Sequence, residues 1–243
     1  DETLGHGVAC RILHRRVSFF GACGANHGWW DNTGAGFVAR QNPLALEATK
    51  QGKEHTMQLQ LSTWQEVERY LEGSTGIVIP IGSAEQHGPN GLIGTDAICP
   101  EVIARSLGEA AGALIAPTIS VGIAQHHLAF AGSMCLRPST LIALMRDYVV
   151  SLSRHGFDRF YFLNGHGGNI ATANAAFAEI HSDVSMLVRE APRPIRCRLA
   201  NWWDGKGVKK LQAELYGDDE GQHATCSEVS VTQYAYPQAI KRV

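Results

Sequence analysis

The sequence lacks the features that mark membrane proteins and nucleic-acid-binding proteins. None of its apolar runs approaches the roughly 20 residues that a helix needs to span a bilayer. The charges nearly balance, with 21 Lys and Arg against 23 Asp and Glu, so no basic surplus suggests a nucleic acid or an anionic lipid surface. We therefore expect a small-molecule partner, no nucleic acid and no membrane.

Paired cysteines are absent as well. The six cysteines, at positions 10, 23, 99, 135, 197 and 226, form no C-x-x-C motif. Scattered thiols in a chain of 243 residues favour a reducing compartment, so we expect free cysteines and a cytoplasmic protein. Internal repeats and low-complexity tracts are missing too.

The first part of the chain does not read like the rest. Residues 1–56 show no sustained period of 2 or 3.6 residues, and we interpret them as an N-terminal extension of uncertain structure. After Met57 the apolar residues recur at helical spacing, with Ser62 or Thr63 as the N-cap. Met57 is therefore a candidate initiator, and residues 57–243 are the expected main domain. A small accessory segment before Met57 is the alternative.

Segments of strand and helix character alternate along the main domain, which predicts an α/β fold with a mainly parallel sheet and helices on both faces. The expected strands are residues 77–81, 113–116, 159–163, 184–188 and 195–199. The expected helices begin after Ser62 or Thr63, at 96 (to 111, with Thr95 as N-cap), after Ser139 or Thr140, after 169 (to about 180), and near Thr225.

A cluster of metal-type ligands follows the first predicted strand. In an extended segment Glu85 and His87 point to one side, and Asp96 stands nine residues further on, after a Gly/Pro-rich loop. Two carboxylates and an imidazole suit Zn, Mn or Fe. This stretch alone is also compatible with a single structural zinc.

The segment NGHGGN, residues 164–169, follows another predicted strand. Its glycines resemble a dinucleotide-binding turn, but the G-x-G-x-x-G spacing requires glycine where Ile170 stands. His166 is the stronger indication, because open α/β sheets hold ligands at the carboxyl ends of their strands. A histidine whose nitrogens are satisfied by turn carbonyls is the alternative.

Near the end of the chain, His223 stands five residues before Glu228. Thr225 and Glu228 fit a capping box at a helix start. Alternatively, Glu228 is a metal ligand or polar orienter and His223 transfers protons in the same cleft.

Three aromatic or imidazole positions are candidates for binding substrate. One of the adjacent histidines at 126 and 127 could line the site or lie on the surface, and His127 is preferred on the resemblance given below. Trp202 and Trp203 follow a predicted strand and could cover a small planar substrate, although a packing role fits them equally well.

Taken together, four motifs resemble the creatininase (creatinine amidohydrolase) family. They are PIGSAEQHGPNGLIGTDA, then H-x-x-F-x-G-S from His127 to Ser133, then NGHGGN, then HATCSEVSVTQ, and they occur in this order over about residues 57–240. The resemblance implies a three-layer α/β/α sandwich and a homo-oligomer, with hexamers among the better-known members. It also implies two divalent metal ions, Zn or Mn or both, with Fe as an alternative.

The resemblance also assigns roles to individual residues. It implies as metal ligands Glu85, His87, Asp96 and His166, with Asp96 bridging the two ions. His223 corresponds to a histidine that moves protons, and Glu228 to the acidic residue five positions after it. Creatininase itself carries a glutamate where this chain has Gly168, so Glu228 becomes the leading candidate for the missing carboxylate ligand.

Further departures bear on the substrate. Asn90 stands where many members have a histidine, and Ala131 and Ser133 replace a proline and a threonine. They indicate a substrate other than creatinine. We therefore predict a metal-dependent hydrolase of a non-peptide C–N bond in a small amide or cyclic amide. The alternatives are a deformylase or small-peptide-cleaving member acting in cofactor biosynthesis, and a non-catalytic metal-binding homologue.

Overall fold

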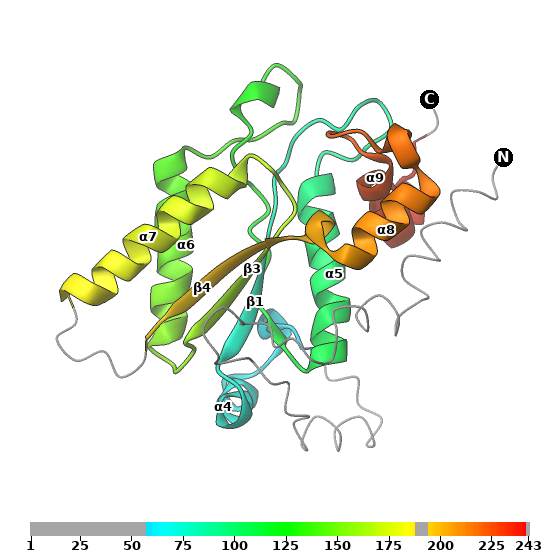
Figure 1. Cartoon of the computed structure of the whole chain (residues 1–243). Coiled ribbons are helices and arrows are strands. Elements are labelled where there is room, and N and C mark those ends of the chain that lie inside the picture. Colours follow the sequence, from blue (N-terminus) through cyan, green and yellow to red (C-terminus); the bar gives the residue numbers. More distant parts are fainter. Residues whose placement is uncertain (1–56, 188–193, 242–243) are drawn as a thin grey trace.

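The computed structural model describes residues 57–187 and 194–241, which are coloured in Figure 1. The extension expected at residues 1–56 lies outside this part of the chain. Helix α4 (Trp64–Gly73) begins at the N-cap Thr63, whose side chain accepts from the Glu66 amide while the Glu66 carboxylate accepts from the Thr63 amide. This capping box fixes the helix start at one of the two predicted N-caps.

In the described part of the chain, four parallel strands form one sheet in the order β2-β1-β3-β4. They are β1 (Gly76–Ile81), β2 (Leu114–Ile115), β3 (Arg159–Asn164) and β4 (Arg196–Asn201). The chain runs from β1 outward to β2 and then crosses to the other side of β1 to form β3. The strand order therefore reverses between β1 and β3, and open α/β sheets bind ligands beyond the carboxyl ends of the strands at such a point.

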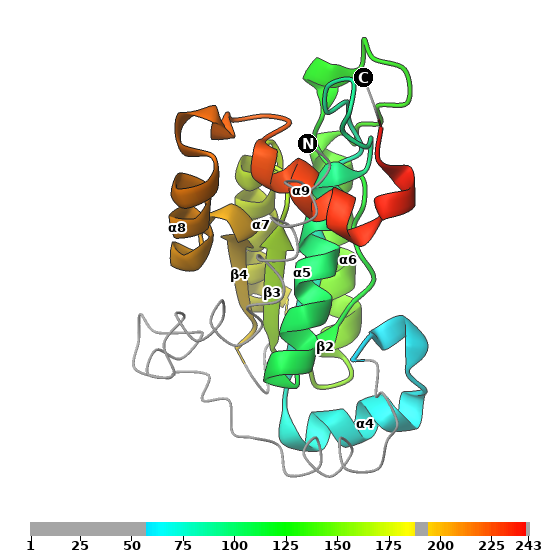
Figure 2. The same cartoon turned by 90° about the vertical axis from the view of Figure 1, so that its right-hand side faces the viewer.

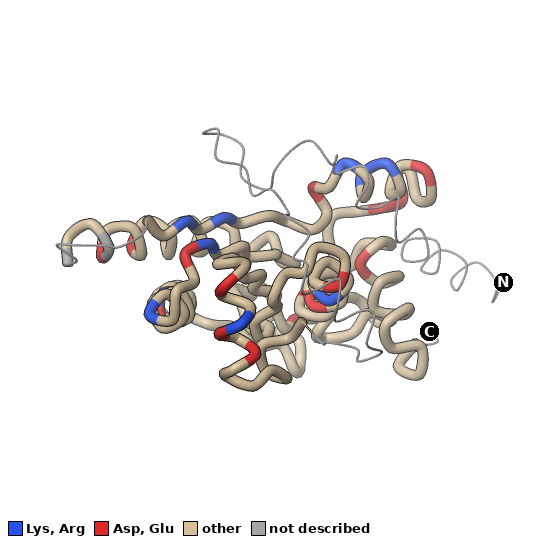
Figure 3. The backbone as a smooth tube through the Cα atoms, turned by 90° about the horizontal axis from the view of Figure 1, so that it is seen from below, with Lys and Arg blue, Asp and Glu red and all other residues tan. Residues whose placement is uncertain are grey.

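Helices cover both faces of the sheet (Figures 1 and 2). One layer holds α6 (Pro138–Ser153) and α7 (Asn169–Leu187), and the other holds α5 (Thr95–Ala111), α8 (Lys206–Leu215) and α9 (Cys226–Ala235). The three-layer α/β/α sandwich is therefore confirmed. Figure 3 shows basic and acidic residues interspersed along the backbone, and the lysines of α8 are followed by the acidic segment Gly217–Glu220.

The alternation of side chains along β1 explains the two layers. Ile77, Ile79 and Ile81 lie in the core cluster with α6 and α7, whereas Val78 lies in the cluster with α5, α8 and α9. A strand with both faces buried reads as a continuous apolar run, which is why residues 77–81 were predicted from the sequence.

One predicted strand is wrong. Residues 184–187 belong to α7, and residue 188 lies outside the described part of the chain. The apolar residues there suited a strand, but no Gly or Pro separates them from the preceding helix, and a helix already formed adds residues at little cost. Helix α8 was not predicted. In addition, α5 begins at Thr95 itself, one residue earlier than predicted. Helix α6 begins at Pro138, because Pro is pre-organised for the first helical position.

The four cysteines in the described ranges are free, as predicted: Cys99, Cys135, Cys197 and Cys226. Within residues 57–187 and 194–241, no helix combines the length and apolar character needed to cross a membrane.

Gly165, at the end of β3, generates a stability prediction. A Cβ there would lie 1.9 Å from the backbone oxygen of Asp96 and 2.6 Å from Cδ of Pro100. Because a backbone atom must then move, we expect Gly165→Ala to lower the free energy of unfolding by about 1–3 kcal/mol, measured by urea denaturation. Gly167→Ala is the matched control, since a Cβ there meets nothing within 4 Å. Equal losses in both variants would contradict the packing argument.

Candidate metal centre

The candidate site lies where three elements end or begin. Glu85 and His87 follow β1, Asp96 stands in the first turn of α5, and His166 follows β3. The sheet order places β1 and β3 side by side, so the segments after them meet at the carboxyl edge. The structure thus brings together the four residues that the sequence indicated as metal ligands.

Asp96 is the centre of this group. Its Oδ1 lies 3.0 Å from Nε2 of His87, and its Oδ2 lies 2.9 Å from Nδ1 of His166. The three side chains are at most 8% exposed. One buried carboxylate therefore faces two imidazoles with separate oxygens.

Glu85 is fully buried, and its two oxygens face different neighbours. Oε2 accepts a hydrogen bond from the Ser83 hydroxyl at 2.9 Å and lies 3.4 Å from Nε2 of His166. Oε1 lies 3.3 Å from Nε2 of His127 and 3.8 Å from Nδ1 of His223.

Glu228 caps helix α9 and also faces the ligand cluster. Its Oε1 accepts from the Thr225 amide at 2.6 Å, which completes the predicted capping box at the start of α9. The same oxygen lies 3.8 Å from Nε2 of His87. The two alternatives raised by the sequence are therefore compatible, and the ligand role of Glu228 remains a prediction.

The residues present fit divalent cations. Two donor sets share Asp96, and the ligand atoms of each set lie within 4.8 Å of one another: Glu85, Asp96 and His166 in one, and His87, Asp96 and Glu228 in the other. Oδ2 of Asp96 is buried, and its contact with Nδ1 of His166, at 2.9 Å, lacks hydrogen-bond geometry. Leaving a buried carboxylate oxygen without a hydrogen bond is costly, so the site favours a bound cation.

The electrostatics of the cluster point the same way. Burial opposes charge on His87, but its hydrogen bond to Asp96 prevails and raises the pKa of His87 to about 9. The close contact with Asp96 raises the pKa of His166 despite its burial, whereas the contacts with both imidazoles outweigh burial and lower the pKa of Asp96. Burial raises the pKa of Glu85, and it raises that of Glu228 to about 7. The cluster thus attracts positive charge, here as protons that a metal would displace.

His223 lies next to the cluster. Its ring centroid is 4.7 Å from that of His87, and its Nε2 is 2.9 Å from the backbone oxygen of Gln86. A carbonyl oxygen only accepts, so Nε2 carries the proton and Nδ1 presents its lone pair to the site. Burial, followed by the charge of His87, lowers the pKa of His223.

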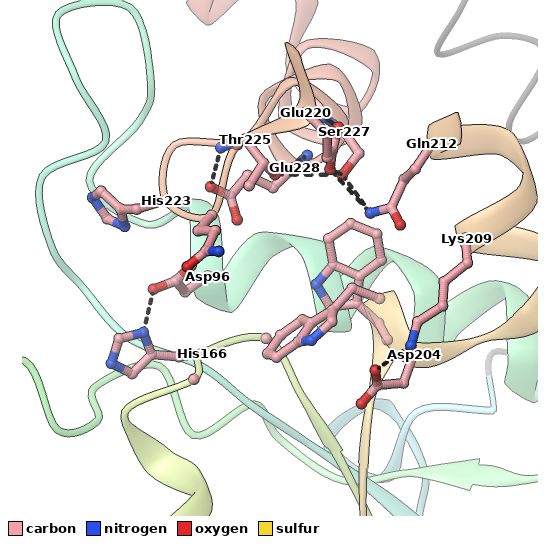
Figure 4. A pocket seen from close by; sticks show the side chains of 16 residues that line it. Asp96, His166, Asp204, Lys209, Gln212, Glu220, His223, Thr225, Ser227 and Glu228 are labelled. Carbon is pink, nitrogen blue, oxygen red and sulfur yellow. Dashed lines mark hydrogen bonds and ion pairs between the residues drawn. The ribbon is translucent and has the colours of Figure 1, made fainter. Parts of the chain in front are cut away.

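A cavity of about 360 Å³ opens beside the ligands (Figure 4). Asp96, His166, His223 and Glu228 line one side, and the predicted substrate-binding residues Trp202 and Trp203 line another. The lining also includes polar and charged side chains, among them Asp204, Lys209, Gln212 and Glu220. His127 is beside Glu85 and is not among the lining residues, and its substrate-binding role stays a prediction.

Some residues of the site were not singled out by sequence. Asn164 donates to the His166 carbonyl at 2.7 Å and accepts from the His166 amide at 3.1 Å, and Asn169 donates to the Gly82 carbonyl at 2.9 Å. These asparagines hold the NGHGGN turn in shape. Gln86 was also missed, although its position between the predicted ligands Glu85 and His87 could have indicated that it lies at the site.

Gly168, which stands where creatininase carries a glutamate, is surrounded closely by other atoms. A Cβ at this position would lie 2.4 Å from Nε2 of His166 and 2.5 Å from the backbone oxygen of Ile123. The present arrangement of His166, whose Nε2 is 2.8 Å from the same oxygen, therefore requires glycine there.

Comparisons with known proteins agree with the fold and with the motifs. The family model described as creatininase, creatinine amidohydrolase, matches residues 60–243. Creatinine amidohydrolase of Pseudomonas putida is 31% identical over 192 residues, covering 73% of this chain and 71% of that protein. Mycofactocin precursor peptide peptidase of Mycobacterium ulcerans (strain Agy99) is 32% identical over 116 residues, which cover 44% of this chain and 46% of the relative. The chain thus matches less than half of that relative.

Solved structures show the same fold. A creatininase described as the Mn form and a mutant creatininase described as the Zn-Zn type each give a TM-score of 0.68 at 24% identity. Each match covers 76% of this chain and 75% of the solved chain.

The two contacts of Glu228 can be separated by substitution. Gln also forms capping boxes, so Glu228→Gln should keep the start of α9 while lowering zinc affinity at least about tenfold, as loss of a ligand or its partner does. Thr225→Ala should instead cost about 1 kcal/mol of stability and lower zinc affinity less than Glu228→Gln does, because the carboxylate and the backbone amide that holds it are both kept. Urea denaturation and zinc titration of both variants provide the measurement. Wild-type zinc affinity in Glu228→Gln would mean that Glu228 is only a cap.

Proposed function

The chain belongs to the creatininase family, and on that premise we propose that it is a metal-dependent hydrolase of a non-peptide C–N bond in a small amide or cyclic amide. The observation that carries the proposal is the buried carboxylate of Asp96, which faces His87 with one oxygen and His166 with the other. A carboxylate shared in this way suits a centre of two ions roughly 3.5–4 Å apart.

The proposed ligands divide between two sites. Glu85, Asp96 and His166 would hold one ion, and His87, Asp96 and Glu228 would hold the other. Zn and Mn are the proposed metals, supported by the donor types and by the Mn and Zn-Zn descriptions of the solved relatives; Fe is also compatible with these donors. When bound, such ions lower the pKa of a coordinated water from 15.7 to about 7 and polarise a carbonyl group.

The chain itself supplies proton transfer. His223 is held through Nε2 by the Gln86 carbonyl, so Nδ1 is the atom that would take up a proton and deliver it to the leaving nitrogen. The lowered pKa of His223 supports this role, because the imidazole is then neutral and able to accept a proton near pH 7.

The cavity supports a small organic substrate. Its volume of about 360 Å³ falls at the lower end of the range of ligand pockets. Trp202 and Trp203, whose rings are 6.2 Å apart and nearly perpendicular, would offer apolar surfaces to the substrate and exclude water from it.

A second candidate is cleavage of a small peptide in cofactor biosynthesis. The similarity to a mycofactocin precursor peptide peptidase favours it, and so does the presence of the polar side chains of Lys209 and Gln212 in the cavity lining. The expected homo-oligomer, with a hexamer as the proposed form, can be checked by analytical ultracentrifugation.

Metal content tests the first step of the proposal. Zinc- or manganese-loaded full-length protein should hold close to two ions per chain by elemental analysis, and Asp96→Ala should lose both because it removes the shared ligand. Circular dichroism should verify that the variant is folded. A folded Asp96→Ala protein that keeps its metal and activity would remove the mechanism.

The role of His223 is tested with the substrate that emerges from a screen of small amides, cyclic amides and short peptides. His223→Asn should lower kcat by about 10²–10⁴-fold while KM and metal content stay near the wild-type values. Unchanged kcat would exclude His223 from proton transfer, and activity confined to peptides would favour the second candidate.

A further inference from the structure

One carboxylate oxygen of Glu85, Oε1, is buried without a hydrogen bond to the described residues. Oε2 has the Ser83 hydroxyl and His166 as neighbours, but Oε1 makes no hydrogen bond within the described residues although Glu85 is fully buried. The nearer of the two imidazole nitrogens that face it is Nε2 of His127, at 3.3 Å, since Nδ1 of His223 is at 3.8 Å. Whether His127 can satisfy Oε1 depends on which of its nitrogens carries the proton.

Gln86 determines that proton's position. The Gly88 amide donates to Oε1 of Gln86 at 2.9 Å, and because a backbone N–H only donates, the amide orientation of Gln86 is fixed. Its Nε2 then faces Nδ1 of His127 at 3.1 Å, so Nδ1 accepts the hydrogen bond. A neutral imidazole has one acceptor and one donor nitrogen, which leaves the proton on Nε2, the nitrogen that lies 3.3 Å from Oε1 of Glu85.

We propose that Gln86 and His127 are positioning residues of the metal centre: Gln86 fixes the Nε2–H tautomer of His127, which donates to Oε1 of Glu85 and leaves Oε2 for the metal. The inference rests on the proposed function in one respect, namely that Glu85 is a ligand. Hydrogen-bonded carboxylates beyond the metal orient the ligand and tune its basicity, and losing such a partner typically costs about 10- to 100-fold in metal affinity or activity.

A third cation at this turn is the competing explanation. Glu85, His126 and His127 have donor atoms close enough to hold one. A metal-bound imidazole must present a lone pair, however, and the Gln86 amide occupies that of Nδ1 while Nε2 carries the proton. His126 is exposed and outside the hydrogen-bond chain from Gly88 to Glu85, so it serves as the matched control.

The tautomer is measured first, on metal-free full-length protein labelled with ¹⁵N at histidine. Long-range ¹H–¹⁵N correlation spectra should show neutral His127 protonated at Nε2. Gln86→Glu should switch it to the Nδ1–H tautomer, because a carboxylate accepts where the amide donated. An Nδ1–H tautomer in the wild type, or an unchanged tautomer in Gln86→Glu, would overturn the inference whatever the metal content.

Zinc titration supplies the second readout. Gln86→Glu and His127→Ala should weaken zinc binding about 10- to 100-fold, His127→Gln should recover part of the loss through its side-chain N–H, and His126→Ala should bind as the wild type does. Wild-type affinity in Gln86→Glu and His127→Ala, or a third zinc per chain that His126→Ala removes, would contradict the proposal. A wild type without zinc affinity would instead refute the proposed function, and the spectra would still decide the tautomer.

Discussion

The structure of the site depends on one interaction, the pairing of the buried Asp96 carboxylate with two imidazoles. Asp96 lies in the first turn of α5, where the helix N-terminus also favours negative charge. His87 and His166 follow the two central strands, so the pair of contacts joins three elements at the point where the strand order reverses. A buried charge is tolerated only when it is paired, and the surrounding hydrogen bonds serve to hold its partners in place.

The layers of the fold can be predicted because buried helix and strand faces produce regular spacings of apolar residues in the sequence. The apolar runs of β1 and β3 and the capping residues Thr63 and Thr225 located their elements closely. Where the cap makes no side-chain hydrogen bond, as at Gly94 and Arg137, the helix start was misplaced. Short apolar runs suit strand and helix alike, and the error at residues 184–188 comes from that ambiguity.

The same contrast holds for the site. Metal coordination restricts residue types so strongly that Glu85, His87, Asp96 and His166 could be found from motif and resemblance. Hydrogen-bonding partners carry no such restriction: the Gln86 side chain donates to His127, 41 residues further along the chain, and the Gln86 backbone oxygen accepts from His223, 137 residues further along. Only the folded loops bring them within 3.1 Å, and no local pattern records that proximity.

The two contacts of Glu228 connect the folding of the first turn of α9 with the binding of a cation. One carboxylate oxygen holds the first turn of α9 through the Thr225 amide and also faces His87. If that oxygen helps to bind a cation only while the turn is formed, cation binding and helix order are linked, and each must favour the other to the same extent. Substitutions far along α9 that change how often its first turn unfolds would then alter metal affinity without replacing a ligand. Conversely, the stability of α9 would depend on whether the metal centre is occupied.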